Sequence, residues 1–255
     1  MSENVLSAFK NELGYVNATN QYVELSVRIT ERDYRTTLKS DLQGLAKSVN
    51  LNVSTLAEDY MSRISKSYIV NIHSCFENFL KTFKDLPGSP TNITEFTKTD
   101  DSLLEWTLGI AIPSLKKEIE SDINICEYYR LIRNCIVHNG EFSSTAKNKR
   151  ALIKSKENSR LSAPNDLSSL TFDDQALFSR SAYNVAKFIF NNSYYDIHTI
   201  FEAHRERLIE LIKPFQEPNS HARAVTKVKH YINVLYPAFT YINWEQEVAK
   251  LFNQV

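Results

Sequence analysis

One segment decides the fold of this chain: residues 122–140 read DINICEYYRLIRNCIVHNG. Apolar side chains recur in it every three or four residues, at Ile125, Tyr129, Ile132 and Ile136. This spacing gathers them on one side of a helix, so the segment predicts a helix from about residue 122 to 138 with one buried face. Gly140 follows where a left-handed residue commonly ends a helix, and we expect it to end this one.

The rest of the chain has the same helical periodicity. Apolar residues spaced by three or four run from Val23 to Val49 and from Ile64 to Phe83, and they predict two long helices. Further helices are expected after Ser102, from about Thr171 toward Leu211 with an interruption at residues 191–192, and in the C-terminal part. Glycine and proline are sparse, and no pair of strand-like segments flanks a hairpin turn. The sequence therefore predicts an all-α, antiparallel helical bundle.

The length of the chain allows one large domain, or one core with appended helices. With 255 residues, the chain is long enough to bury a substantial core.

Composition limits the classes of function. Thirty basic residues balance thirty acidic ones, so a generally basic nucleic-acid binder is not indicated, and a polyanion site must arise from local clustering. The three cysteines, Cys75, Cys126 and Cys135, form no C-x-x-C pair and are typical of buried, reduced thiols. No secretion signal or apolar run of membrane-spanning length is visible. We expect a soluble, cytoplasmic protein.

The segment at 122–140 also has a polar side. Arg130, Asn134 and His138 are four residues apart and share a face, with Arg133 about a quarter turn away. A guanidinium keeps its charge at any working pH, whereas an imidazole exchanges protons near neutrality. Cleavage of a phosphodiester needs both abilities together.

This arrangement resembles the HEPN family (higher eukaryote and prokaryote nucleotide-binding domains), whose signature places an arginine, a polar residue and, after three further residues, a histidine at the end of a core helix. Arg133, Asn134 and His138 match this pattern position by position, and residues 67–80 are similar to the first core helix of such proteins. The resemblance covers about residues 52–212. It implies a HEPN-like helical core over residues 52–213, preceded by an N-terminal helical extension, residues 1–51, and followed by a C-terminal helical extension, residues 214–255. One toxin subgroup has tyrosine two residues after the histidine; here that residue is Gly140, so the regulation of that subgroup is not carried over.

The resemblance implies a metal-independent endoribonuclease that acts as a homodimer with RNA bound at the dimer interface, and it implies no cofactor. His138 would act as general base or acid, Arg133 would stabilise charge on the phosphoryl oxygens, and Asn134 would orient the imidazole or bind phosphate. Many such enzymes are toxins or antiviral defence effectors, so an antitoxin or another regulatory partner is conceivable but unidentified.

Other residues are candidates for supporting roles. Glu77, in the predicted helix upstream, either holds Arg130 or Arg133 in place or is a rim residue facing water. Asn139 directly follows His138. The polar segment 141–160 either guides an RNA backbone or is a solvated, flexible loop; its candidate RNA contacts are Lys147, Lys149 and Arg150.

Three readings of the motif remain open at this stage. The first is the ribonuclease. The second is a binding module that uses the same polar face for RNA, a nucleotide or a protein without cleavage. The third is a structural helical scaffold, in which Arg133 and His138 only cap the helix and pair with acidic neighbours. The histidine and cysteine spacings suit no metal site, so none is assigned.

Overall fold

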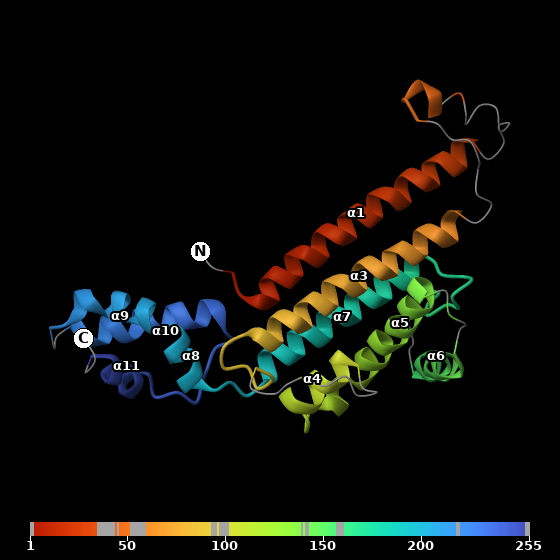
Figure 1. Ribbon diagram of the computed structural model, residues 1–255. Coiled ribbons are helices and arrows are strands. Elements are labelled where there is room, and N and C mark those ends of the chain that lie inside the picture. Colours follow the sequence, from red (N-terminus) through yellow and green to blue (C-terminus); the bar gives the residue numbers. More distant parts are fainter. Residues whose placement is uncertain are drawn as a thin grey trace. The chain divides into compact units, whose positions relative to one another are not determined.

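The computed structural model describes residues 3–34, 44, 46–51, 60–92, 96, 102–138, 140, 143–156, 161–217 and 220–252. This part of the chain contains helices and no strand, which confirms the predicted all-α class (Figure 1). The longer helices are α1 (Val5–Tyr34), α3 (Tyr60–Asp85), α5 (Glu120–His138), α6 (Ser144–Lys156), α7 (Phe172–Asn192) and α10 (His221–Leu235). The shorter ones are α4 (Leu103–Ala111), α8 (Ile197–Ala203), α9 (Arg205–Ile212) and α11 (Trp244–Phe252).

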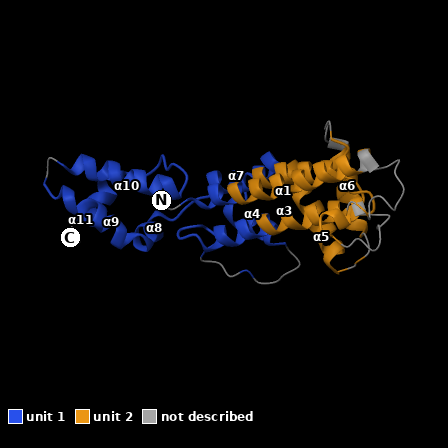
Figure 2. Cartoon of the chain, turned by 90° about the horizontal axis from the view of Figure 1, so that it is seen from above, with its two compact units in different colours: residues 1–10, 76–119, 184–255 blue, residues 11–75, 120–183 orange. Residues whose placement is uncertain are grey.

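The chain divides into two compact units, coloured separately in Figure 2. Unit 1 comprises residues 1–10, 76–119 and 184–255, and unit 2 comprises residues 11–75 and 120–183. Helices α1, α3 and α7 contribute residues to both units. The predicted boundaries at residues 51 and 213 follow a different criterion, the extent of the HEPN resemblance, and stay a prediction.

Unit 2 contains Arg133, Asn134 and His138, and aromatic side chains fill its core. Tyr129 of α5 stacks on Phe178 of α7 with 4.9 Å between ring centroids. Tyr68 of α3 meets Phe172 edge to face and donates a 3.4 Å hydrogen bond to Glu24 of α1. These contacts tie α5 to α7 and α3 to α1, so the unit has one continuous core.

Asp174 at the start of α7 is a polar centre within this core. Its carboxylate is fully buried and accepts hydrogen bonds from the Tyr129 hydroxyl (2.8 Å), from the backbone and side-chain amides of Asn165 (2.8 and 2.9 Å), and from the backbone amide of Thr171 (2.9 Å). A buried carboxylate is tolerated when its oxygens are this fully bonded. Asp174 thereby fixes α5, the 161–171 segment and the first turn of α7 together.

Unit 1 has its own core around Tyr195, which is almost fully buried. Its ring contacts Phe83, Tyr236 and Phe239 edge to face, and its hydroxyl donates to the backbone carbonyl of Phe190 at 2.8 Å. Helices α9, α10 and α11 pack on one another in this unit.

Local signals explain several helix ends. Ser102 caps α4, because its hydroxyl accepts from the amide of Glu105 at 3.1 Å. The chain turns at Gly88, shortly after α3 ends, and the φ of 71° at this residue suits glycine. A Cβ there would lie 2.5 Å from the Asp196 carbonyl oxygen. The interruption expected at residues 191–192 is confirmed, since α7 ends at Asn192 and α8 begins at Ile197.

Two predictions about helices are wrong. The first helix begins at Val5 rather than near Val23, and Val23 is exposed; the buried side of α1 includes Leu13, Asn20 and Glu24. Because this buried face includes polar residues, apolar periodicity in the sequence did not reveal the first part of the helix. Residues 35–43 and 45, on which much of the rest of that prediction falls, lie outside the described residues.

The second correction concerns residues 141–160. This segment, for which a solvated, flexible loop was one of two readings, contains helix α6, which packs against α5. The Ser143 hydroxyl caps it by accepting from the Ala146 amide at 3.2 Å, and Ala146 and Ile153, seven residues apart, are buried. Two apolar anchors are enough because the helix lies on an existing core.

Among the described residues, no helix is long and apolar enough to cross a lipid bilayer. The three cysteines are free thiols; Cys75 and Cys126 are buried, and Cys135 is half-buried. Burial raises the pKa of the Cys75 thiol to about 12, so this thiol stays protonated at neutral pH.

Candidate active site at the end of helix α5

The candidate site occupies the last two turns of α5. The predicted buried face is confirmed for Ile125, Tyr129 and Ile132, while Ile136 is only half-buried. With this face packed inward, the polar residues of the motif lie at the border of the core and at the surface: Arg130, Arg133 and Asn134 are half-buried, and His138 is exposed. The sequence placed this polar stripe correctly.

Arg133 has an unusual environment for an arginine. Its Nη1 donates one 3.3 Å hydrogen bond to the side-chain oxygen of Asn134, and its Nε lies buried without an acceptor. No carboxylate among the described residues lies within ion-pair distance of its guanidinium. A buried donor without a partner costs free energy, and an anion that reaches this guanidinium would recover it.

Arg130, the neighbouring arginine, does have a carboxylate partner. Arg130 Nε donates to Glu127 Oε2 at 2.7 Å, and the Glu127 side chain is only 1% exposed. Glu127 is a residue that the sequence argument missed, although its spacing of three residues from Arg130 on one helix was a usable signal. Glu77, the carboxylate proposed instead, forms an ion pair with Lys81 at 2.8 Å. We therefore assign to Glu127 the role of holding Arg130.

His138 ends the helix with its ring in solvent. It makes no hydrogen bond or ion pair with the described residues. The carbonyl end of α5 favours a positive charge at this position. An exposed imidazole with both nitrogens free can accept a proton from a bound molecule and return it.

The turn after His138 differs from the predicted one. Gly140 does not have a positive φ, so it is not the left-handed residue. Instead its amide donates to the Cys135 carbonyl at 3.1 Å, the outermost bond of a closed helix end. Asn139, a candidate supporting residue, lies outside the described residues.

Unit 2 also has a basic hollow, which we call the Lys66–Lys147 hollow. It encloses about 400 Å³ and is lined by Lys66, Lys147, Asp166, Leu167 and Ser168. Neither lysine ammonium has a partner among the described residues. Asp166 is neutralised by Arg150, whose Nη1 lies 2.5 Å from its Oδ1, so the two lysines leave the hollow positively charged.

The three basic candidates of this region thus have different environments. Lys147 lines the hollow and is exposed, and Lys149 is half-buried. Arg150 binds Asp166 and also donates to the backbone carbonyl of Pro164 at 3.0 Å. Its guanidinium joins α6 to the 161–171 segment, and the RNA contact proposed for it from the sequence stays a prediction.

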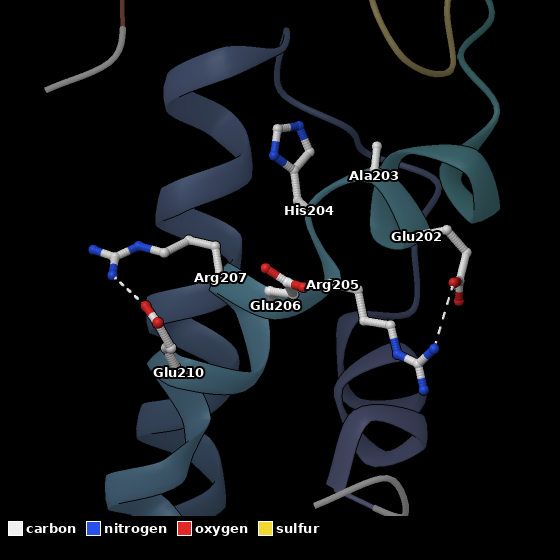
Figure 3. A pocket seen from close by; sticks show the side chains of 7 residues that line it. All are labelled: Glu202, Ala203, His204, Arg205, Glu206, Arg207 and Glu210. Atoms are coloured by element: carbon white, nitrogen blue, oxygen red, sulfur yellow. Dashed lines mark hydrogen bonds and ion pairs between the residues drawn. The ribbon is translucent and has the colours of Figure 1, made fainter.

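A second hollow, of about 610 Å³, lies in unit 1 around the junction of α8 and α9 (Figure 3). Its arginines are matched by carboxylates, with Arg205 3.9 Å from Glu202 and Arg207 2.8 Å from Glu210. The two ring nitrogens of His204 lie 3.1 Å from the Tyr236 hydroxyl and 3.2 Å from the Tyr231 hydroxyl. Because both of its arginines are paired with carboxylates and its histidine lies within hydrogen-bond distance of two tyrosine hydroxyls, this hollow is a weaker candidate site.

Within the described residues, no three histidine, cysteine, aspartate or glutamate side chains gather where they could hold a metal ion.

We compared the chain with known proteins, and no family model, no curated protein and no solved structure matches it.

Proposed function

We propose that this protein is a HEPN-type endoribonuclease whose reaction is carried out by Arg133 and His138. The observation that carries the proposal is that two side chains near the end of α5 have no charged partner among the described residues. Arg133 is half-buried without a carboxylate partner in the described chain, and His138 is exposed with both ring nitrogens free. A phosphodiester supplies the anion that the first group lacks and the proton transfer that the second can perform.

The proposed reaction uses a nucleophile that RNA itself provides. His138 takes the proton of a ribose 2′-OH, and the 2′ oxygen attacks the adjacent phosphorus. The bond from phosphorus to the 5′ oxygen breaks, and that oxygen receives a proton as it leaves. The products are a 2′,3′-cyclic phosphate and a 5′-OH end. The guanidinium of Arg133 stabilises the negative charge that develops on the phosphoryl oxygens, an effect often worth about 10²–10³ in rate.

Asn134 is placed to assist this reaction. Its side-chain oxygen accepts from Arg133, so the amide nitrogen of the same side chain remains available to a phosphate oxygen. As implied by the HEPN resemblance, we propose a homodimer in which both copies supply Arg133 and His138. We place the enzyme in the cytoplasm, where its free thiols would stay reduced.

The Lys66–Lys147 hollow supports RNA as the substrate. It lies in the same unit as Arg133, and α6, which provides Lys147, packs directly on α5. Two ammonium groups that have no partner among the described residues are suited to phosphates of the same strand on either side of the cleaved linkage.

A non-catalytic RNA-binding module is the second candidate. His138 has no carboxylate or carbonyl partner among the described residues to fix its tautomer, whereas catalytic histidines are commonly oriented by such a partner. In that case Arg133 and the hollow would bind RNA and His138 would be an ordinary surface residue.

Incubation of the purified full-length protein with total RNA and with tRNA, in the presence of EDTA, separates the two candidates. We expect the wild type to cleave RNA and His138→Ala and Arg133→Ala to lose at least a hundredfold in rate with unchanged circular dichroism. His198→Ala and Arg207→Ala, which remove an exposed histidine and an exposed arginine of unit 1, are the matched controls and should cleave like wild type. Equal cleavage by wild type and His138→Ala would refute the proposed ribonuclease activity.

A further inference from the structure

Arg130 has hydrogen-bond donors near the candidate site that the fold leaves unused. Glu127 Oε2 accepts from Arg130 Nε at 2.7 Å, and within the described part of the chain no acceptor meets the two terminal nitrogens, Nη1 and Nη2. The Arg130 side chain is 30% exposed, so a molecule from solvent can reach it. These two nitrogens form the end of the planar guanidinium fork, which matches two oxygens of one phosphate.

Glu127 holds this guanidinium in place. Its side chain is 1% exposed, and a buried carboxylate needs a cation beside it. Arg130 is therefore ordered before any ligand arrives, whereas an arginine in open solvent samples many rotamers and loses that freedom when it binds. A buried acid that fixes a partly exposed arginine is the arrangement that a preorganised anion-binding group requires.

The position of Arg130 on α5 relates it to the proposed cleavage site. It lies about one helical turn before both Arg133 and Asn134, and side chains at these spacings have Cβ atoms about 5–6 Å apart. His138 follows one turn later, on the face that Arg130 and Asn134 share. A strand that places its cleaved linkage at Arg133 and His138 can therefore run along α5 and bring the next phosphate to Arg130.

We propose that Arg130 binds the phosphate next to the cleaved one on the same strand, with Glu127 as the residue that positions it. This inference deepens the proposed function and rests on it for the identity of the cleaved linkage. Arg133, whose charge no carboxylate of the described chain balances, acts on the charge that develops during the reaction. Arg130 contacts a phosphate whose charge stays the same, so it strengthens the binding of substrate and of transition state equally.

Steady-state kinetics with single-stranded RNA separates this role from a purely structural one. Arg130→Lys keeps a cation beside Glu127 but replaces the fork with a single ammonium. We expect about a tenfold rise in KM with kcat within about twofold of wild type, whereas Arg133→Ala loses kcat. Glu127→Gln/Arg130→Gln, which removes both charges of the pair, should raise KM in the same way and serves if the first variant fails to fold. Arg207→Lys, which changes the exposed arginine of another pair with three-residue spacing, is the matched control and should leave both constants unchanged.

A neutral linkage in the substrate tests the contact itself. The substrate is a short RNA in which every nucleotide but one carries a 2′-O-methyl group, so only one linkage can be cleaved by the proposed reaction. A methylphosphonate, which has no charge, replaces the phosphate directly on the 5′ side or directly on the 3′ side of that linkage. In wild type, one of the two replacements should lower kcat/KM about tenfold, and in Arg130→Lys the same replacement should lower it less than about threefold.

Equal losses in wild type and Arg130→Lys, or no loss from either replacement, would overturn the proposal while leaving the ribonuclease intact. If wild type does not cleave RNA, fluorescence anisotropy of the same strands bound to the two proteins takes the place of the kinetics. A loss of affinity on replacement that Arg130→Lys abolishes would then support the phosphate site and remove the ribonuclease. Affinities that do not change with the neutral linkage would overturn the phosphate site as well.

Discussion

Arg133 donates a single 3.3 Å hydrogen bond to the side-chain oxygen of its neighbour Asn134, while its own Nε is buried without an acceptor. The nearby arginines are different: Arg130 is held by Glu127 and Arg150 by Asp166. Among these three, Arg133 alone has no carboxylate in the described part of the chain. The proposed function depends on this unequal distribution of counter-ions.

Asn134→Asp should weaken RNA binding more than Asn134→Ala. The aspartate would place a carboxylate beside Arg133 and satisfy the guanidinium within the protein, so RNA would have to displace it. We expect about a tenfold lower affinity for RNA with Asn134→Asp and a smaller loss with Asn134→Ala. Fluorescence anisotropy in the His138→Ala background, where RNA stays intact, measures both. A stronger effect of the alanine would show that the amide, not the free guanidinium, matters.

Neutralising the Lys66–Lys147 hollow should reduce the salt dependence of RNA binding. Each phosphate contact to a single strand contributes about 0.7 to the slope of log affinity against log salt, so Lys66→Gln/Lys147→Gln should lower that slope by about 1.4. Lys227→Gln/Lys229→Gln, a pair of exposed lysines on α10, is the matched control. An unchanged slope in the first variant, or an equal change in both, would mean that the hollow does not contact the backbone.

Asp174→Ala should strongly destabilise unit 2. The substitution leaves the hydroxyl of Tyr129 and the amides of Asn165 and Thr171 without their acceptor in a buried place. We expect a loss of at least about 3 kcal/mol in the free energy of unfolding, against about 1 kcal/mol for Tyr129→Phe, which removes one of these bonds. Urea denaturation followed by circular dichroism compares them. Similar losses for the two variants would contradict the central role of the carboxylate.

His204 should make unit 1 less stable in acid. Burial lowers the pKa of its imidazole in the folded protein, whereas the unfolded chain has the ordinary value of about 6.5. Below that pH the unfolded state binds a proton that the folded state resists, so stability is full above about pH 6.5 and falls as the pH decreases. The change in melting temperature between pH 7.5 and 5.5 should shrink in His204→Gln but not in His198→Ala. An equal acid sensitivity in all three proteins would exclude His204 as its cause.

The sequence predicted the helices whose apolar residues face a core. The helix predicted over residues 122–138 is α5, which begins two residues before the expected start, and the helices expected in the C-terminal part are α10 and α11. The apolar period is set by burial, so it reveals helices of this kind directly. Helix α6 was missed because its outward side is polar and only Ala146 and Ile153 anchor it.

The candidate site was predictable in its residue types but not in its pairings. Spacing alone put Arg130, Asn134 and His138 on one face, which the structure confirms. It could not show that Glu127 neutralises Arg130, that Asp166 neutralises Arg150, or that Lys66 joins Lys147 in one hollow. Those pairings depend on which groups the fold brings together, and Asp166 and Lys66 are distant in sequence from their partners.

Analysis of the ends of RNA treated with the purified protein tests the central claim most directly. In the presence of EDTA, the fragments should have 2′,3′-cyclic phosphate and 5′-OH termini, and none should form with His138→Ala or Arg133→Ala. Fragments with 5′-phosphate ends, or the same cyclic ends from the His138→Ala protein, would contradict the proposed roles of Arg133 and His138.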